Sequence, residues 1–103
     1  MSFIVEDKNY IELPANYNRL SQSHRKKVRE QYIELQDGKC SFCKDPLKGK
    51  VPLAVKEKKI NRNLFPKGFF DYPVHLHHDH DTGMTIGAVH AICNAVLWQY
   101  YGE

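Results

Sequence analysis

Apolar positions along this chain follow a helical period first and a strand period later. Residues 21–37 carry apolar side chains at helical spacing, with Val28, Tyr32 and Leu35 directed inward. An early serine can cap the start of such a helix, and Gly38 is placed to end it. The pattern therefore predicts a helix over 21–37.

The last third of the chain predicts two strands and a second helix. "PVHLHHDH" has the apolar and β-branched character of a strand, "DTG" is typical of a turn, and "MTIGAV" predicts a second strand that completes a hairpin. "HAICNAVLWQYYGE" then predicts a closing helix, with Val96, Leu97 and Tyr100 at inward-facing spacing. The order strand, turn, strand, helix predicts an α+β fold.

Two segments lack a clear period. Residues 1–20 contain Pro14 with several Asn and Tyr, and we expect an N-terminal arm that is extended or forms a short strand. Residues 44–72 are expected to be loop-like, with strand fragments such as "VPLAV". A chain of 103 residues suffices for one domain, which we place at 21–103 with a hairpin-and-helix core at about 74–101.

Composition narrows the class of protein. A hydrophobic content of 42% with 26% charged residues is typical of a folded globular chain. No apolar run approaches the ~20 residues of a membrane helix, and the first residues lack the basic and apolar regions of a secretion signal. We therefore expect a cytoplasmic, intracellular protein with reduced thiols and no membrane partner.

Positive charge is concentrated in one segment. The net charge is +3, and the excess lies within 44–72, where basic residues are interleaved with phenylalanines. Such a mixture suits a nucleic-acid surface, although a solubilising surface over a small aromatic core has the same composition. The basic run at 24–29 would lie on the exposed side of the first helix, either solvated or in contact with phosphate. The densest part of the 44–72 segment is the candidate DNA-binding set Lys56, Lys58, Lys59 and Arg62.

Cysteine spacing predicts a metal site. Cys40 and Cys43 in "CSFC" share an x2 spacing with His90 and Cys93 in "HAIC". Three cysteines cannot form a closed set of disulfides, whereas tetrahedral zinc accepts three thiolates and one imidazole. Zinc would then fasten the region around residue 40 to the final helix. His75 or His80 could replace His90, but the matched spacing favours His90.

Four histidines and two aspartates fall within "HLHHDHDTG", residues 75–83. A neutral imidazole can take a proton from water, and another imidazole or a carboxamide can hold a divalent cation that stabilises charge on a phosphate. Alternatively, the histidines are surface residues of a module that only binds. In a regular strand His77 and His78 point to opposite faces, so both can serve one site only where the strand ends or bulges.

The motif resembles the HNH endonucleases of the recombination endonuclease VII type. "LHHDHDTG" and "IGAVHAICNAVL" are similar to that family's Asp-His-Asp-His, Thr-Gly and Cys-x2-Cys-Asn pattern, and the match is ungapped over residues 76–97. Upstream of a longer connecting segment, "DGKCSFCKDPL" matches the family's first Cys-x2-Cys. The resemblance implies a small ββα-metal (His-Me finger) domain and metal-dependent hydrolysis of DNA phosphodiester bonds. The family is common in bacteriophages and mobile elements.

The resemblance also implies roles for individual residues. His78 takes the position of the general base, and His80 contacts the scissile phosphate or supports the site. His77 and Asn94 hold a catalytic divalent cation (Mg²⁺, Mn²⁺ or Ni²⁺), with Asn94 also helping to position it, and the products carry 5′ phosphates. The structural zinc ligands implied are Cys40, Cys43, His90 and Cys93.

The chain departs from the family pattern at two positions, and alternatives stay open. His77 replaces an Asp that the family often has, which lowers the negative charge around the cation and favours softer ions such as manganese or nickel. His90 replaces a Cys, a tolerable exchange for zinc. The active pair could instead be Asp79 and His80, with Asp79 as metal ligand. The alternative function is a non-catalytic, zinc-stabilised nucleic-acid-binding module, and a dimer is compatible with either.

Overall fold

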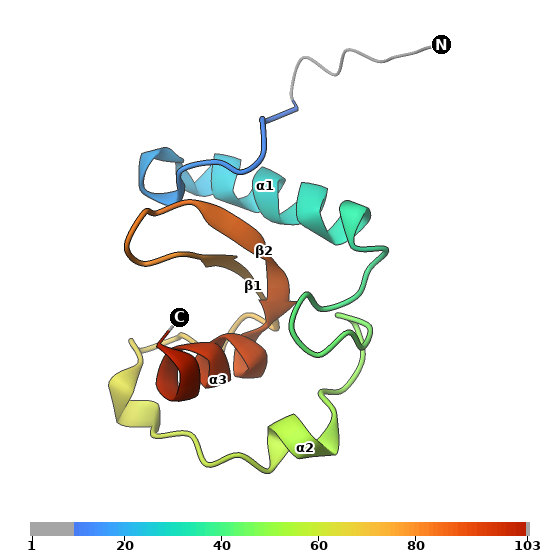
Figure 1. The fold of residues 1–103 in the computed structure, drawn as a ribbon, viewed down its shortest axis with the longest axis vertical. Helices are drawn as coiled ribbons and strands as arrows, with labels where there is room; N and C mark the ends of the chain where they lie inside the picture. Colours follow the sequence, from blue (N-terminus) through green and yellow to red (C-terminus); the bar gives the residue numbers. More distant parts are fainter. Residues whose placement is uncertain (1–9, 103) are drawn as a thin grey trace.

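The computed structural model describes residues 10–102 and arranges them in layers around a β-hairpin (Figure 1). Helix α1 (Gln22–Leu35) lies on one side of the antiparallel strands β1 (Val74–His78) and β2 (Thr85–His90), and helix α3 (Ala91–Tyr101) lies on the other. Within the described residues, a two-stranded sheet and three helices define a small α+β protein, as the sequence predicted.

Helix α1 begins and packs as the sequence predicted, but its last turn does not. Ser21 caps it, its hydroxyl accepting from the His24 backbone N–H at 3.2 Å, and Val28 is fully buried. Leu35, expected to face inward, is 68% exposed. The reason is that the amide of Gln36 makes the contact at this end, accepting from the Ala88 N–H and donating to the Ala88 carbonyl, both at 2.9 Å.

The hairpin contains an irregularity at its histidines. Val74 pairs with His90 and His77 with Gly87, after which the register shifts between His77 and His78. Such a bulge changes the direction of the side chains that follow it. Gly87 lies beside the C-terminal end of α1: a Cβ there would meet the Gln36 Oε1 at 2.8 Å, so a side chain at this position would displace the Gln36 amide from its hydrogen bonds with Ala88.

The described part of the N-terminal arm, residues 10–20, is folded onto the hairpin. The Tyr17 N–H donates to the Gly83 carbonyl at 2.7 Å, and the Thr85 N–H donates to the Ala15 carbonyl at 2.8 Å. A single β-bridge joins Asn16 to Met84, and a 3-10 turn, Tyr17–Arg19, follows. Residues 1–9 of the expected arm lie outside the described residues.

The connection from 44 to 72 wraps around α3 rather than forming strands (Figure 1). "VPLAV" was expected as a strand fragment, and this prediction is wrong: Leu53–Lys56 form a short helix, α2. Val55, in this short helix, is buried in the core. Its backbone N–H donates to the Pro52 carbonyl, so the segment forms its backbone hydrogen bonds without a strand partner. A second 3-10 turn spans Arg62–Leu64.

Helix α3 forms as predicted, with one inward position misassigned. Val96 and Leu97 are buried, whereas Tyr100 is 46% exposed because its hydroxyl donates to the Lys59 carbonyl at 2.6 Å on the surface. Gly102, at φ +72°, ends the helix. Between residues 10 and 102, no helix combines the length and the apolar character needed to cross a membrane.

Candidate active-site cavity and metal centre

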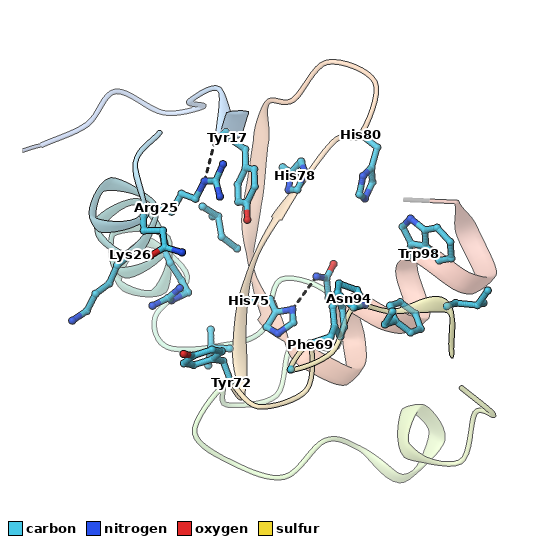
Figure 2. A pocket seen from close by; sticks show the side chains of 18 residues that line it. Tyr17, Arg25, Lys26, Phe69, Tyr72, His75, His78, His80, Asn94 and Trp98 are labelled. Atoms are coloured by element: carbon cyan, nitrogen blue, oxygen red, sulfur yellow. Dashed lines mark hydrogen bonds between the residues drawn. The ribbon is translucent and has the colours of Figure 1, made fainter. Parts of the chain in front are cut away.

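A cavity of about 730 Å³ opens between α1, β1 and α3 (Figure 2). Three of the predicted site residues line it: His78 and His80 from the hairpin, and Asn94 from the first turn of α3. His75 also lines it. Arg25 of α1 and Asn94 of α3 are distant in sequence. They border the same space because the cavity lies between these two helices.

His78 is held in a stack of side chains. Its ring lies parallel to that of Tyr17, with centroids 3.9 Å apart and 6° between the planes. The guanidinium of Arg25 lies 3.8 Å from the same Tyr17 centroid, and both groups can approach so closely only on opposite faces of the phenol. The Arg25 Nε–H also donates to the Tyr17 carbonyl at 3.1 Å, so the stack is fastened at its outer end.

The electrostatic surroundings keep His78 neutral. Burial lowers the pKa of its imidazole, and the charges of His80, His77 and Arg25 lower it further. The ring of His80 lies 4.9 Å away between centroids. An imidazole with a pKa below its ordinary value is unprotonated at neutral pH and can accept a proton.

His75 and Asn94 contact one another directly. The Asn94 amide Nδ2 donates to the His75 Nδ1 at 3.1 Å, as the dashed line in Figure 2 marks. The ring of Phe69 meets His75 edge-on at 4.6 Å, and burial lowers the pKa of this histidine as well. His75 therefore occupies the position beside Asn94 that the sequence-based expectation gave to His77.

His77 lies elsewhere. It is 3% exposed and is not among the residues that line the cavity, although the strand has the irregularity that a site shared by His77 and His78 would need. The resemblance assigned a shared cation to His77 and Asn94, and the structure brings only Asn94 to the cavity. Asp79, the metal ligand in the alternative register, is also outside the lining; its Oδ1 accepts from the Asp81 and Thr82 N–H groups in the turn.

The basic residues at the cavity come from α1. Arg25, Lys26 and Arg29 line it, whereas the candidate DNA-binding set does not. Within that set, Lys58 lies over the ring of Tyr100 and Arg62 over the ring of Phe70, at 5.0 Å and 4.4 Å from the centroids. Those two cations therefore have aromatic partners within the chain.

The cavity also contains residues that the sequence did not mark as part of a site. Tyr17 belongs to the expected arm and Trp98 to the expected core helix, and neither lies in a motif that would identify it. The basic run at 24–29 was expected to be either solvated or in contact with phosphate, and that was the available signal for Arg25.

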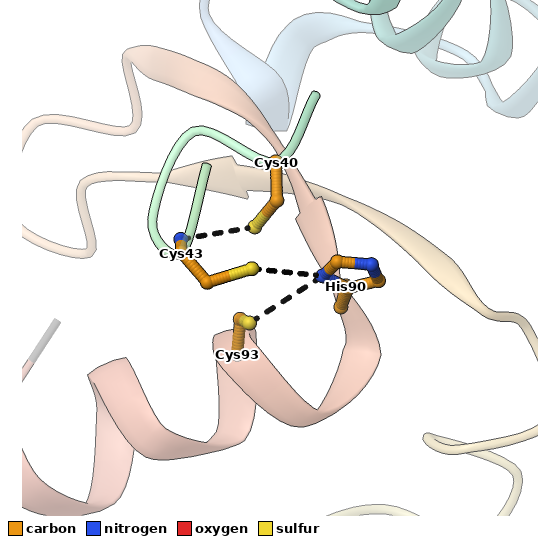
Figure 3. Close-up of side chains that lie close together, drawn as sticks. All are labelled: Cys40, Cys43, His90 and Cys93. Atoms are coloured by element: carbon orange, nitrogen blue, oxygen red, sulfur yellow. Dashed lines mark hydrogen bonds between the residues drawn. The ribbon is translucent and has the colours of Figure 1, made fainter. Parts of the chain in front are cut away.

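The geometry at the C-terminal end of β2 supports the metal-centre prediction. One ligand atom each from Cys40, Cys43, His90 and Cys93 lies within 4.8 Å of all the others (Figure 3). His90 Nδ1 is 3.4 Å from the Cys43 Sγ and 3.6 Å from the Cys93 Sγ. Tetrahedral zinc with bonds of about 2.3 Å to sulfur and about 2.0 Å to nitrogen requires about 3.5 Å between such atoms. The four residues could hold a structural metal such as zinc.

Neighbouring groups orient these ligands. His90 Nε2 lies 3.0 Å from the Pro46 carbonyl and donates to it, which leaves the Nδ1 lone pair for the cysteines. The backbone N–H groups of Phe42 and Cys43 point at the Cys40 sulfur, at 3.4 and 3.5 Å. A hydrogen bond from Cys93 is the main cause that lowers the pKa of the Cys40 thiol, so this sulfur carries a negative charge readily.

Comparisons of this chain with protein-family models, with curated proteins and with solved structures give no significant match.

Proposed function

We propose that this protein is a zinc-stabilised, metal-dependent DNA endonuclease with a ββα-metal core formed by the hairpin and α3. The observation that carries the proposal is the cavity itself, where a neutral, part-buried imidazole, His78, lines the same space as arginine and lysine side chains of α1. A general base beside cationic groups is the arrangement that phosphodiester hydrolysis requires. The resemblance of residues 76–97 to HNH endonucleases supports the same assignment.

The residues of the cavity have different roles in the proposed hydrolysis. His78 accepts a proton from a water molecule, and the resulting hydroxide attacks the phosphorus. The bond from phosphorus to the 3′ oxygen breaks, leaving a 5′ phosphate and a 3′ hydroxyl that takes its proton from solvent. Lys26 and Arg29 of α1, which line the same space, hold the phosphate, and His80 lies close enough to His78 to contact the same group.

A divalent cation would stabilise the charge that develops on the leaving oxygen. The donors implied for it fit only in part, because His77 is outside the cavity lining and Asn94 is hydrogen-bonded to His75. Among the described residues, the Cys/His group is the one cluster of three or more His, Cys, Asp or Glu that converges on a point. The experiment therefore compares several divalent cations.

The test is plasmid nicking with magnesium, manganese or nickel added in turn. His78→Ala should reduce cleavage by a factor of ~10² to 10⁴, the contribution of a positioned general base, while its folding and DNA binding stay near those of the wild type. His24→Ala, which removes an exposed imidazole from α1, is the matched control and should cut normally. Normal cleavage by His78→Ala together with inactivity of His80→Ala would move the base to His80.

The second candidate is a zinc-stabilised module that binds nucleic acid without cleaving it. The burial of His77 outside the cavity favours it, because the expected cation site is then incomplete. A wild-type protein that binds DNA but does not nick it with any of the three cations would establish this alternative.

A further inference from the structure

The cavity has two chemically different walls. On the α1 side it is cationic, with Arg25, Lys26 and Arg29. On the α3 side it is aromatic, with Trp98 backed by Phe65 and Phe69. No Asp or Glu is among the residues that line the cavity within the described chain, so its fixed charge is wholly positive. The site thus suits a ligand that is anionic at one end and flat and apolar at the other.

The aromatic wall is built around Trp98. Phe65 meets Trp98 at 66° with centroids 5.6 Å apart, and it contacts Phe69 and Phe70 in turn. This packing supports the indole without stacking a ring parallel to it. Trp98 remains 41% exposed, on the side of the cavity that also carries Asn94 (Figure 2).

Regular duplex DNA cannot use such a wall, because its bases are already stacked inside the helix. An unpaired nucleotide can, since its base offers a free face for stacking and its phosphates remain available to cations. The volume of about 730 Å³ is within the range of ~300 to 1,000 Å³ typical of pockets for small ligands, so one nucleotide fits.

We propose that the cavity binds an unpaired nucleotide of single-stranded DNA, with its base stacked on Trp98 and its phosphate held by Lys26 and Arg29. This inference rests on the proposed function for the identity of the nucleic acid and deepens it by naming the substrate class: DNA that is single-stranded or locally unpaired near the cleaved bond.

Trp98 is the only tryptophan of the chain, so its fluorescence reports on this wall directly. The wild-type protein, without added divalent cation, is titrated with a thymidine oligonucleotide, with an abasic oligonucleotide of equal length and charge, and with a matched duplex. The thymidine strand should quench the indole fluorescence and bind more tightly than the other two. Equal quenching and equal affinity for the abasic strand would overturn the proposal.

Three variants of α3 separate stacking from a general decrease in aromatic surface. Trp98→Leu should weaken binding of the thymidine strand roughly 5- to 150-fold, the effect of removing one stacked base, and Trp98→Phe should recover part of it. Tyr101→Leu removes an exposed ring from the same helix outside the cavity and should bind like the wild type. Unchanged affinity in Trp98→Leu would exclude stacking on this residue.

The binding experiment and the cleavage experiment can fail separately. Quenching by the thymidine strand in a protein that never nicks DNA would keep the nucleotide site and remove the nuclease. Cleavage of duplex DNA without any quenching would keep the nuclease and remove the nucleotide site.

Discussion

At the scale of single residues, the position of His78 depends on two partners from a distant part of the chain. Tyr17 covers one face of the imidazole, and Arg25 covers the far face of Tyr17. A part-buried ring that is stacked in this way has little freedom to rotate, which favours a fixed direction for proton transfer. We therefore infer that Tyr17 is a positioning residue for the proposed general base.

Replacement of Tyr17 tests this role. Tyr17→Leu removes the stack and should lower the cleavage rate at saturating DNA about tenfold, as expected when a reacting group is no longer held in its orientation. Tyr17→Phe keeps the ring and should cleave at nearly the wild-type rate, since the stack is made by the ring faces. The measurement is the single-turnover rate, with the melting temperature as a control for folding. If both variants cleave at the wild-type rate, the stack has no influence on His78.

At the scale of elements, α1 supplies the cationic wall of the cavity. Charge density along the sequence favoured phosphate contacts from Lys56, Lys58, Lys59 and Arg62, and that remains a prediction. The structure places these four residues in the connection that wraps around α3, outside the cavity lining, whereas Lys26 and Arg29 line it. The α1 surface and the 56–62 segment are therefore alternative sites for the phosphate contacts.

Charge-matched double variants distinguish the two surfaces. Lys26→Gln with Arg29→Gln should weaken binding to every single-stranded sequence alike and reduce the log–log salt slope by about 1.4, because each neutralised phosphate of a single strand accounts for about 0.7. Lys56→Gln with Lys59→Gln removes the same charge from exposed positions. It should leave the slope nearly unchanged where α1 holds the strand and lower the slope where the 56–62 segment does. The reverse pattern would show that the 56–62 segment holds the DNA. Filter binding over a range of salt concentrations is sufficient.

At the scale of the whole molecule, the Cys/His group joins two parts of the chain that are distant in sequence. Cys40 and Cys43 belong to the turn after α1, and His90 and Cys93 belong to the junction of β2 and α3. Cys40 and Cys93 are also members of the main hydrophobic cluster, together with Val89 and Val96. A metal at this point would stabilise the core and the position of α3, and with it the aromatic wall of the cavity.

We predict one tightly bound zinc per chain. His90→Ala or Cys93→Ser should lose the metal and several kcal/mol of folding free energy, because binding of a structural zinc contributes ~10 kcal/mol or more, and the melting temperature should fall by roughly 20 °C. His24→Ala, the control, should retain both metal and stability. Metal analysis of protein purified without added metal, followed by thermal melting, gives the result. A folded wild-type sample that contains no zinc would contradict the prediction.

Local sequence patterns determined most of the secondary structure and the candidate metal ligands. Helix α1, the hairpin and α3 follow from period and capping, which act over a few residues. The grouping of Cys40 and Cys43 with His90 and Cys93 also follows, because two x2 pairs that supply three thiolates and one imidazole match the spacing of zinc sites. Leu35, Tyr100 and "VPLAV" were misassigned, because whether an apolar residue is buried depends on what lies opposite it.

Only the tertiary structure decided which residues share the cavity. Alternation puts His77 and His78 on opposite faces and a bulge could bring them to one site, so sequence could not tell that His78 would line the cavity and His77 would lie outside it. Nor could it bring Tyr17 and Trp98 to the same space, because their meeting depends on the arm pairing with the hairpin and on α3 packing against that hairpin. Spacing along the chain specifies ligands within one turn, whereas contacts between distant segments depend on the packing of whole elements.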